Sequence, residues 1–248
     1  QKSDHLIDIW KSHPAKDEYW SFKDTNSRVG KVTAPAIHVG GWWDIFAQGT
    51  IDSFVSRQYH GGKGARGNQK LVIGAWLHGP KKDPGEFELP DNFNHDFGAD
   101  AARFMAYWLR GEDNGIMDEP QLRCWMENPM PPRTHYPERP GRWVAEESWP
   151  SPRIEPSIWH LNRDGLAQTP GNSTRLQISS PLNVGQMAGQ WCAHGLDADL
   201  PADQRYEAGG SLLFDSEALD DAVEILGAPI VDLELDCDQA QGMVAVCL

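Results

Sequence analysis

The sequence contains no run of about 18 consecutive apolar residues, the length that a helix needs to cross a bilayer, so no membrane-spanning segment is expected. It is also poor in positive charge, because 22 Lys and Arg stand against 36 Asp and Glu and the formal net charge is −14. Nucleic acids bind to cationic surfaces, so a nucleic-acid partner is excluded. No signal peptide is recognised at the start of the sequence, which opens on Gln1.

Cysteine is scarce, with four in the chain and no C-x-x-C pair among them. No Cys/His cluster has zinc-finger spacing, and neither a D-x-D-x-D-G calcium loop nor a Gly-rich phosphate loop is present. The sequence therefore predicts no metal site and no cofactor. Buried free thiols in a reducing, cytoplasmic compartment are the expected state, with a Cys237–Cys247 pair across a hairpin as the alternative.

The composition is that of a globular protein, with 40% hydrophobic and 23% charged residues. Its 248 residues are enough for one large domain or two of ordinary size. Helical spacing of apolar residues is found at 6–10 and at 97–110, and a strand is expected at 121–126. After a proline-rich stretch at 129–140, the pattern changes to short β-type segments separated by turns, which indicates an all-β sandwich or jelly roll. These segments are 143–144, 157–161, 176–178, 211–214, 223–226, 231–235 and 243–248.

The stretch 34–80 holds two short apolar runs, and each leads to a residue that can do acid–base chemistry. The run 36–39 is followed by Asp44, and the run 71–73 is followed by His78. A segment with helical spacing lies between them, so we expect strand, Asp loop, helix, strand and His loop in that order. The runs are apolar without alternation, which is typical of parallel strands that are covered on both faces.

Asp44 and His78 are the candidate catalytic residues. In an open α/β sheet, catalytic groups collect beyond the carboxyl ends of the strands, where both residues are expected. An Asp in contact with a His fixes its tautomer and stabilises the imidazolium that forms when it takes a proton. The order Asp before His is also that of the α/β-hydrolases. As isolated residues at strand ends, however, the two are more often a helix cap and a hydrogen-bonded surface histidine.

Two motifs around these residues resemble one family of hydrolases. G-G-W-W-D-I-F at 40–46 and G-A-W-L-H-G at 74–79 are similar to the CocE/NonD hydrolases, which include cocaine esterase-like acyl esterases and X-Pro dipeptidyl-peptidases of the S15 group. Further segments at 13–20, 104–116 and 149–229 extend the resemblance over nearly the whole chain.

The resemblance implies α/β plus all-β architecture, with the C-terminal part of an α/β-hydrolase domain followed by an incomplete β jelly roll. The domains implied are a cap remnant, the second half of the hydrolase domain, a linker, and a truncated galactose-binding-like sandwich. Their ranges are 1–33, 34–128, 129–142 and 143–248.

The resemblance also assigns roles to residues. Asp44 matches the acid of a Ser-His-Asp triad and His78 its general base. Phe46 is similar to an aromatic residue that lines the acyl pocket, and Trp43 occupies a substrate-binding position that is commonly Tyr. The substrate implied is a small acyl ester or an X-Pro peptide.

The chain departs from the family in its nucleophile. A G-x-S-x-G motif should precede Asp44, and none is present. Ser173 is a near miss, but it lies downstream in the wrong order and lacks the second glycine. We therefore expect the nucleophile outside this chain, a missing N-terminal half of the hydrolase domain as a partner, and no activity from the isolated chain. The sequence carries no feature that defines an oligomeric state.

A binding module is the alternative function. Eleven tryptophans are compatible with a carbohydrate-binding β-sandwich that has residues 1–128 as an accessory α/β domain, although β-rich cores also bury many tryptophans. A G-x-S-x-G motif in the reading frame upstream of Gln1 would decide for the hydrolase. Among the other histidines, His38 is expected to be a hydrogen-bonded core residue, and His60 and His95 are expected in loops.

Overall fold

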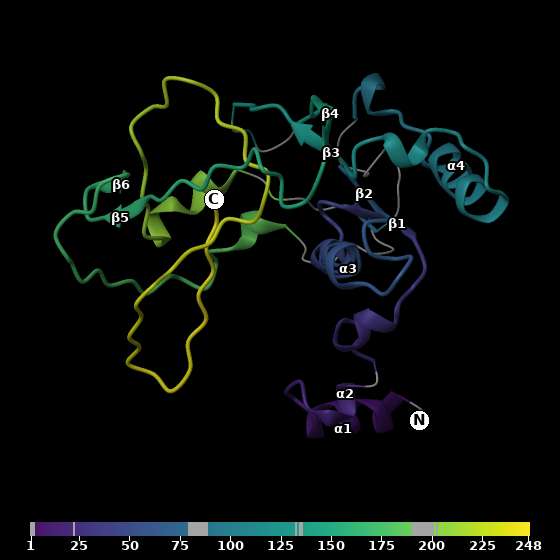
Figure 1. Cartoon of the computed structure of the whole chain (residues 1–248). Helices are drawn as coiled ribbons and strands as arrows, with labels where there is room; N and C mark the ends of the chain where they lie inside the picture. Colours follow the sequence, from purple (N-terminus) through teal and green to yellow (C-terminus); the bar gives the residue numbers. More distant parts are fainter. Residues whose placement is uncertain are drawn as a thin grey trace.

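The computed structural model describes residues 3–21, 23–78, 89–131, 133, 136–189, 201 and 203–248. Figure 1 shows an α/β unit built on one sheet, with the N-terminal helices below it and the C-terminal third of the chain beside it as long extended loops. The expected α/β architecture is present in the first of these parts.

The main sheet has four strands in the order β1-β2-β3-β4. The strands β1 (Ala36–Gly41), β2 (Gln69–Gly74) and β3 (Leu122–Glu127) are parallel, and β4 (Gly141–Glu146) pairs antiparallel with β3. Every residue of β2 is buried, the polar Gln69 and Lys70 at its start included, as expected for a central strand. The strands predicted at 36–39, 71–73 and 121–126 are thus confirmed.

One face of the sheet is covered by α3 (Ala47–His60), the crossover helix between β1 and β2. Phe54 of this helix packs with four residues of β2 and β3 into one core cluster. The side chain of Gln58 accepts a hydrogen bond from the backbone N–H of Gln69 at 3.0 Å, which ties the end of the helix to the start of β2. The four residues that pack with Phe54 are Leu71, Ile73, Leu122 and Cys124.

The opposite face carries an aromatic cluster beside α4 (Phe97–Arg110). Trp76 and Trp125 are almost fully buried there and pack with Phe93 of the 3₁₀ helix η2 (Asp91–Phe93). A second 3₁₀ helix, η3 (Ile116–Asp118), leads from α4 towards β3.

The helix α4 matches its predicted range because both of its ends are marked in the sequence. The carboxylate of Asp96 accepts a hydrogen bond from the Ala99 N–H at 2.9 Å, which satisfies one of the unpaired donors of the first turn. Gly111 ends the helix with φ of 70°, a left-handed conformation that glycine adopts without strain.

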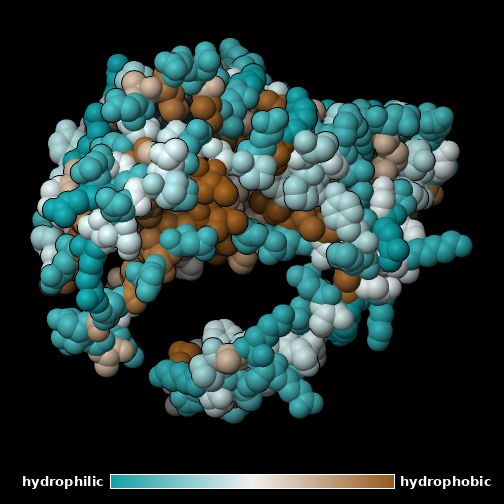
Figure 2. Space-filling model, turned by 60° about the vertical axis from the view of Figure 1, so that its left-hand side comes forward, coloured by the Kyte–Doolittle hydropathy of each residue, from teal (hydrophilic) through white to brown (hydrophobic). Residues whose placement is uncertain are grey.

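The N-terminal segment is helical, in agreement with its apolar spacing. It consists of α1 (Ser3–Ser12), α2 (Glu18–Ser21) and the 3₁₀ helix η1 (Asn26–Lys31). The apolar residues Leu6, Ile7 and Trp10 of α1 remain nearly half exposed. Figure 2 shows an apolar band on the body of the molecule, facing a hollow that separates it from the α1–α2 segment at the bottom. Trp20 of α2 lies beside Trp10, with ring centroids 6.5 Å apart, and the described part of the chain leaves the apolar side of α1 partly uncovered.

The C-terminal part differs from the sequence interpretation. Residues 143–144 lie in a strand, β4, that pairs with β3 of the mixed sheet along its whole length. After it come the short hairpin of β5 (His160–Asn162) and β6 (Gly165–Ala167) and the 3₁₀ helices η4 (Gln186–Ala188) and η5 (Gln204–Gly210).

The segments expected as strands at 176–178, 211–214, 223–226, 231–235 and 243–248 form no strand in the described residues. A strand needs a neighbour for its backbone groups and a second sheet over its apolar face, and here apolar side chains such as Leu182, Ile230 and Met243 are exposed. The jelly roll therefore stays a prediction. None of the helices in the described ranges is long and apolar enough to cross a membrane.

Candidate active site

Asp44 and His78 meet at one edge of the sheet. Asp44 lies in the loop between β1 and α3, and His78 lies in the loop that follows β2. Because β1 and β2 are adjacent parallel strands with Gly41 opposite Gly74, both loops leave the same end of the sheet. The His78 Nδ1 lies 3.1 Å from Oδ2 and 3.3 Å from Oδ1 of Asp44.

The surroundings of the two side chains suit different roles. The carboxylate of Asp44 is 10% exposed, whereas the imidazole of His78 is 47% exposed. Asp44 Oδ1 also accepts the backbone N–H of Phe46 at 2.9 Å, which limits the directions in which the carboxylate can turn. An imidazole that donates its Nδ1–H to a carboxylate presents Nε2 as the basic nitrogen. The contact can therefore hold one tautomer of His78, with the proton on Nδ1.

The Asp44 loop is tied to the sheet by backbone and side-chain hydrogen bonds. The backbone N–H of Trp42 donates to Gly74 at 2.9 Å, and its indole Nε1–H donates to the carbonyl of Trp125 at 2.8 Å. Gly41 allows the close approach of the two loops, because a Cβ at this position would lie 2.1 Å from the carbonyl oxygen of Trp76. Packing therefore requires glycine at position 41 of the G-G-W-W-D motif.

The two predicted substrate-binding residues lie in different environments. Phe46 is 56% exposed, and its ring contacts His78 edge-on with centroids 5.3 Å apart. Trp43 packs against the aromatic cluster, with the guanidinium of Arg139 over its ring at 5.6 Å. Phe46 therefore borders the exposed side of the imidazole, and Trp43 lies in the wall behind the Asp44 loop.

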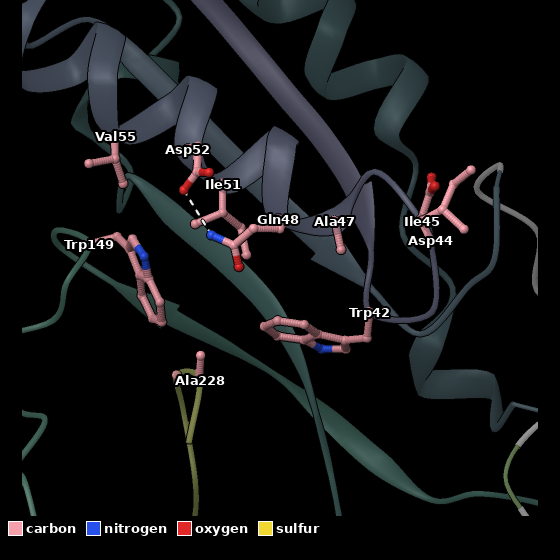
Figure 3. Close-up of a pocket in the computed structure, with 11 residues that line it drawn as sticks. Trp42, Asp44, Ile45, Ala47, Gln48, Ile51, Asp52, Val55, Trp149 and Ala228 are labelled. Carbon is pink, nitrogen blue, oxygen red and sulfur yellow. Dashed lines mark hydrogen bonds between the residues drawn. The ribbon is translucent and has the colours of Figure 1, made fainter. Parts of the chain in front are cut away.

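A cavity of about 550 Å³ adjoins this loop on the α3 side. Its walls include Trp42, Ile51, Trp149 and Ala228 (Figure 3). In Figure 3, Asp44 lies at the end remote from Trp149, and neither His78 nor Phe46 lines the cavity. Asp44 thus lines one end of the cavity, and His78 lies outside its lining.

Two further histidines, His38 and His95, make side-chain contacts, whereas His60 lies in the last turn of α3 and not in a loop as expected. His38 Nε2 lies 3.0 Å from Gln69 Oε1, and burial lowers the pKa of His38, so the expected hydrogen bond is present although the residue is only partly buried. His95 does lie in a loop, but its Nε2 is 2.5 Å from the carboxylate of Asp100. Arg123 Nη1 reaches the same carboxylate at 3.3 Å, so a half-buried ionic cluster joins α4 to β3. The sequence reasoning missed it; its one signal is an Asp on the apolar side of a predicted helix.

Two further expectations concern cysteines and metals. Cys124 is free and buried as expected, whereas Cys237 and Cys247 are free but exposed, so neither their burial nor a Cys237–Cys247 disulfide is realised. Across the ranges that the structure describes, no group of three or more His, Cys, Asp or Glu is arranged to hold a metal ion.

Comparison with known sequences gives the class of protein that this fold and Asp–His pair define. Residues 1–80 match the model of the X-Pro dipeptidyl-peptidase (S15 family), and residues 114–248 match that of the X-Pro dipeptidyl-peptidase C-terminal non-catalytic domain. The chain therefore belongs to the CocE/NonD family of hydrolases, the S15-type family that its motifs resemble.

Three similar proteins carry related names. A cocaine esterase from Rhodococcus sp. (strain MB1 Bresler) is 25% identical over 248 aligned residues, which cover 90% of this chain and 39% of that protein. A putative serine esterase from Mycobacterium bovis is 24% identical over 84% of this chain and 31% of its own length. A solved CocE/NonD family hydrolase from Staphylococcus aureus aligns with a TM-score of 0.46 and 15% identity, over 66% of this chain and 25% of that one. The chain thus spans 39% and 31% of the lengths of these two curated relatives.

Proposed function

We propose that this chain supplies the acid and the general base of a serine hydrolase of the acyl esterase or X-Pro dipeptidyl-peptidase type. The observation that carries the proposal is the 3.1 Å separation between His78 Nδ1 and Asp44 Oδ2 at the carboxyl ends of two adjacent parallel strands. Family membership supports a hydrolase, and this pair supplies the chemistry that a serine mechanism requires of an acid and a base.

In the proposed mechanism the nucleophilic serine comes from a segment outside these residues. His78 Nε2 takes the proton of the serine hydroxyl while the serine oxygen attacks the carbonyl carbon of an ester or an X-Pro amide. Asp44 stabilises the imidazolium, which then protonates the leaving alcohol or amine. Water, deprotonated by His78, hydrolyses the acyl-enzyme and releases the acid. Alone, the chain has no nucleophile and is inactive.

The acyl side of the substrate is proposed to lie against Phe46. Its ring is exposed and contacts the imidazole of His78 edge-on, so it adjoins the position from which His78 would act. Trp43 is proposed to support this side from behind the Asp44 loop, where it packs on the aromatic cluster. A small acyl ester or an X-Pro peptide would present the right kind of carbonyl to this site.

The domain plan is part of the proposal. Residues 1–33 would belong to a cap, residues 34–128 to the hydrolase domain, and residues 143–248 mainly to a jelly roll that requires further strands to close. The exposed apolar residues of α1 and of the C-terminal segments support this plan, because isolated apolar segments are stabilised only when other elements cover them. A missing N-terminal half of the hydrolase domain is the proposed partner.

The test compares the chain alone with a longer polypeptide that includes the upstream segment. We expect no turnover of p-nitrophenyl butyrate or Ala-Pro-p-nitroanilide by the chain alone and turnover of at least one by the longer protein. In the longer protein, Asp44→Asn should lower kcat on the order of 10⁴-fold by favouring the wrong tautomer of His78. His60→Ala is the matched control, because His60 is an exposed histidine at the end of α3.

Two results would overturn the proposal. One is esterase activity of the purified chain that disappears in His78→Ala, which would place the nucleophile within these 248 residues. The other is a loss of less than about tenfold in Asp44→Asn, far below the loss expected for a triad acid. The ratio of ester to X-Pro turnover in the active protein would assign the substrate class.

A further inference from the structure

We infer that Arg139 and Glu127 form a positioning pair that holds Asp44 in reach of His78 by way of Trp43. The inference rests on the proposed function of Asp44 and His78 and adds two residues to it. Both lie on the β3–β4 hairpin, Glu127 at the end of β3 and Arg139 two residues before β4.

Arg139 contacts the Asp44 loop through the ring of Trp43. The guanidinium carbon of Arg139 lies 5.6 Å from the centre of the Trp43 ring, within the range of a cation–π interaction. Trp43 immediately precedes Asp44, so a shift of its indole moves the backbone that carries the carboxylate. On the other side of the loop, the Trp42 indole is already tied to Trp125. Two consecutive indoles thus anchor the loop to β3 and the hairpin.

Glu127 and Tyr136 hold the guanidinium of Arg139 in place. Its Nη2 lies 2.8 Å from Glu127 Oε2, and the two side chains are 27% and 26% exposed. The ring of Tyr136 lies 5.5 Å from the same guanidinium. The hairpin around the pair is closed, because Asn128 N–H donates to Pro140 at 3.0 Å. Arg139 is therefore held in one direction, with its flat face available to Trp43.

The ion pair between Arg139 and Glu127 has a cost in folding stability. Burial raises the pKa of Glu127, and Arg139 opposes this rise. The other oxygen, Oε1, is buried without a hydrogen-bond partner among the residues that the structure describes. A half-satisfied buried carboxylate destabilises a fold, and replacing such an ion pair by apolar side chains is often neutral or stabilising. Stability alone does not account for the pair, whereas fixing Arg139 over Trp43 does.

The experiment reads the Asp44–His78 contact directly, in the chain as it stands. Labelling histidine with ¹⁵N and ¹³C makes the imidazole rings visible by NMR. The His78 signals are those that disappear in His78→Gln. Asp44→Asn defines the change that follows when the contact is lost. We expect Arg139→Met to shift the His78 signals in the same direction and to a comparable extent. Arg142→Met is the matched control, because Arg142 lies on the same hairpin but pairs with Glu224.

A double variant, Glu127→Leu with Arg139→Met, separates positioning from a structural role. We expect its thermal midpoint to equal or exceed that of the parent, while its His78 signals shift as in Arg139→Met. His78 signals that stay at the parent position in both Arg139 variants, while Asp44→Asn moves them, would refute the positioning role alone. A shift that occurs only together with a lowered midpoint would also refute it. If Asp44→Asn itself leaves His78 unchanged, the proposed function falls together with the inference.

Discussion

Replacing Leu71 by alanine should remove a large part of the stability of the α/β unit. Leu71 is 1% exposed in the central strand β2 and packs with Phe54, Ile73 and Leu122. In the sheet it lies opposite His38 on one side and Leu122 on the other. The substitution removes three carbon atoms from a site whose walls are hydrogen-bonded strands and a packed helix. Because these walls cannot move inwards easily, most of the cavity will remain.

The magnitude follows from the transfer and cavity terms. Buried Leu→Ala substitutions cost about 2–5 kcal/mol, and poor collapse of the site favours the upper part of this range, about 3–4 kcal/mol. With a urea dependence of about 3 kcal/mol per molar, the unfolding midpoint should fall by about 1 M. Tryptophan fluorescence is a suitable probe, since Trp42 packs against the same cluster.

Leu109→Ala is the matched control, because it makes the same chemical change at a residue of α4 that is 77% exposed. Its effect should stay within about 0.5 kcal/mol, as for most surface substitutions. If Leu71→Ala and Leu109→Ala lower the midpoint equally, Leu71 is not in a closed core, and the assignment of β2 as the central buried strand is refuted.

Two further predictions concern titration. Burial lowers the pKa of His38 from its ordinary 6.5, so the unfolded chain binds this proton more readily and stability should fall as the pH drops below about 6.5. In His38→Gln, urea midpoints measured between about pH 7.5 and 5 should fall less, and an unchanged slope would contradict the assignment. Burial raises the pKa of the Cys124 thiol to about 12, so iodoacetamide at about pH 8 should label exposed Cys237 and Cys247 in the native chain and spare Cys124. Peptide mass spectrometry would show this, and rapid labelling of Cys124 would contradict its burial.

The elements that local sequence predicts well are those whose signals are local. The apolar run of β2 lies in a strand that is buried along its whole length, and β1 beside it is only partly buried. The helix α4 is marked by its apolar spacing, by Asp96 at its start and by Gly111 at its end. Nothing distant is needed to recognise such signals.

The structure of the C-terminal part is harder to predict, because a short β-type segment shows a preference for strand without indicating which strand it would pair with. The sequence indicates a β-type segment at 143–144 but not its partner, which in the structure is β3. A β-type segment also becomes a strand only when another strand accepts its hydrogen bonds, and the later segments have none among the described residues.

By itself, the sequence determined the order of strand, Asp loop, helix, strand and His loop, and the motifs that assign the chain to its family. Tertiary structure decided what lies within contact. The pairing of β1 with β2 brings Asp44 to 3.1 Å from His78 across 34 residues of chain. The tertiary structure also places Arg139 over Trp43 and joins Asp100 to His95 and Arg123. Local periodicity does not encode such contacts, because they depend on which strands are neighbours and in which register they pair.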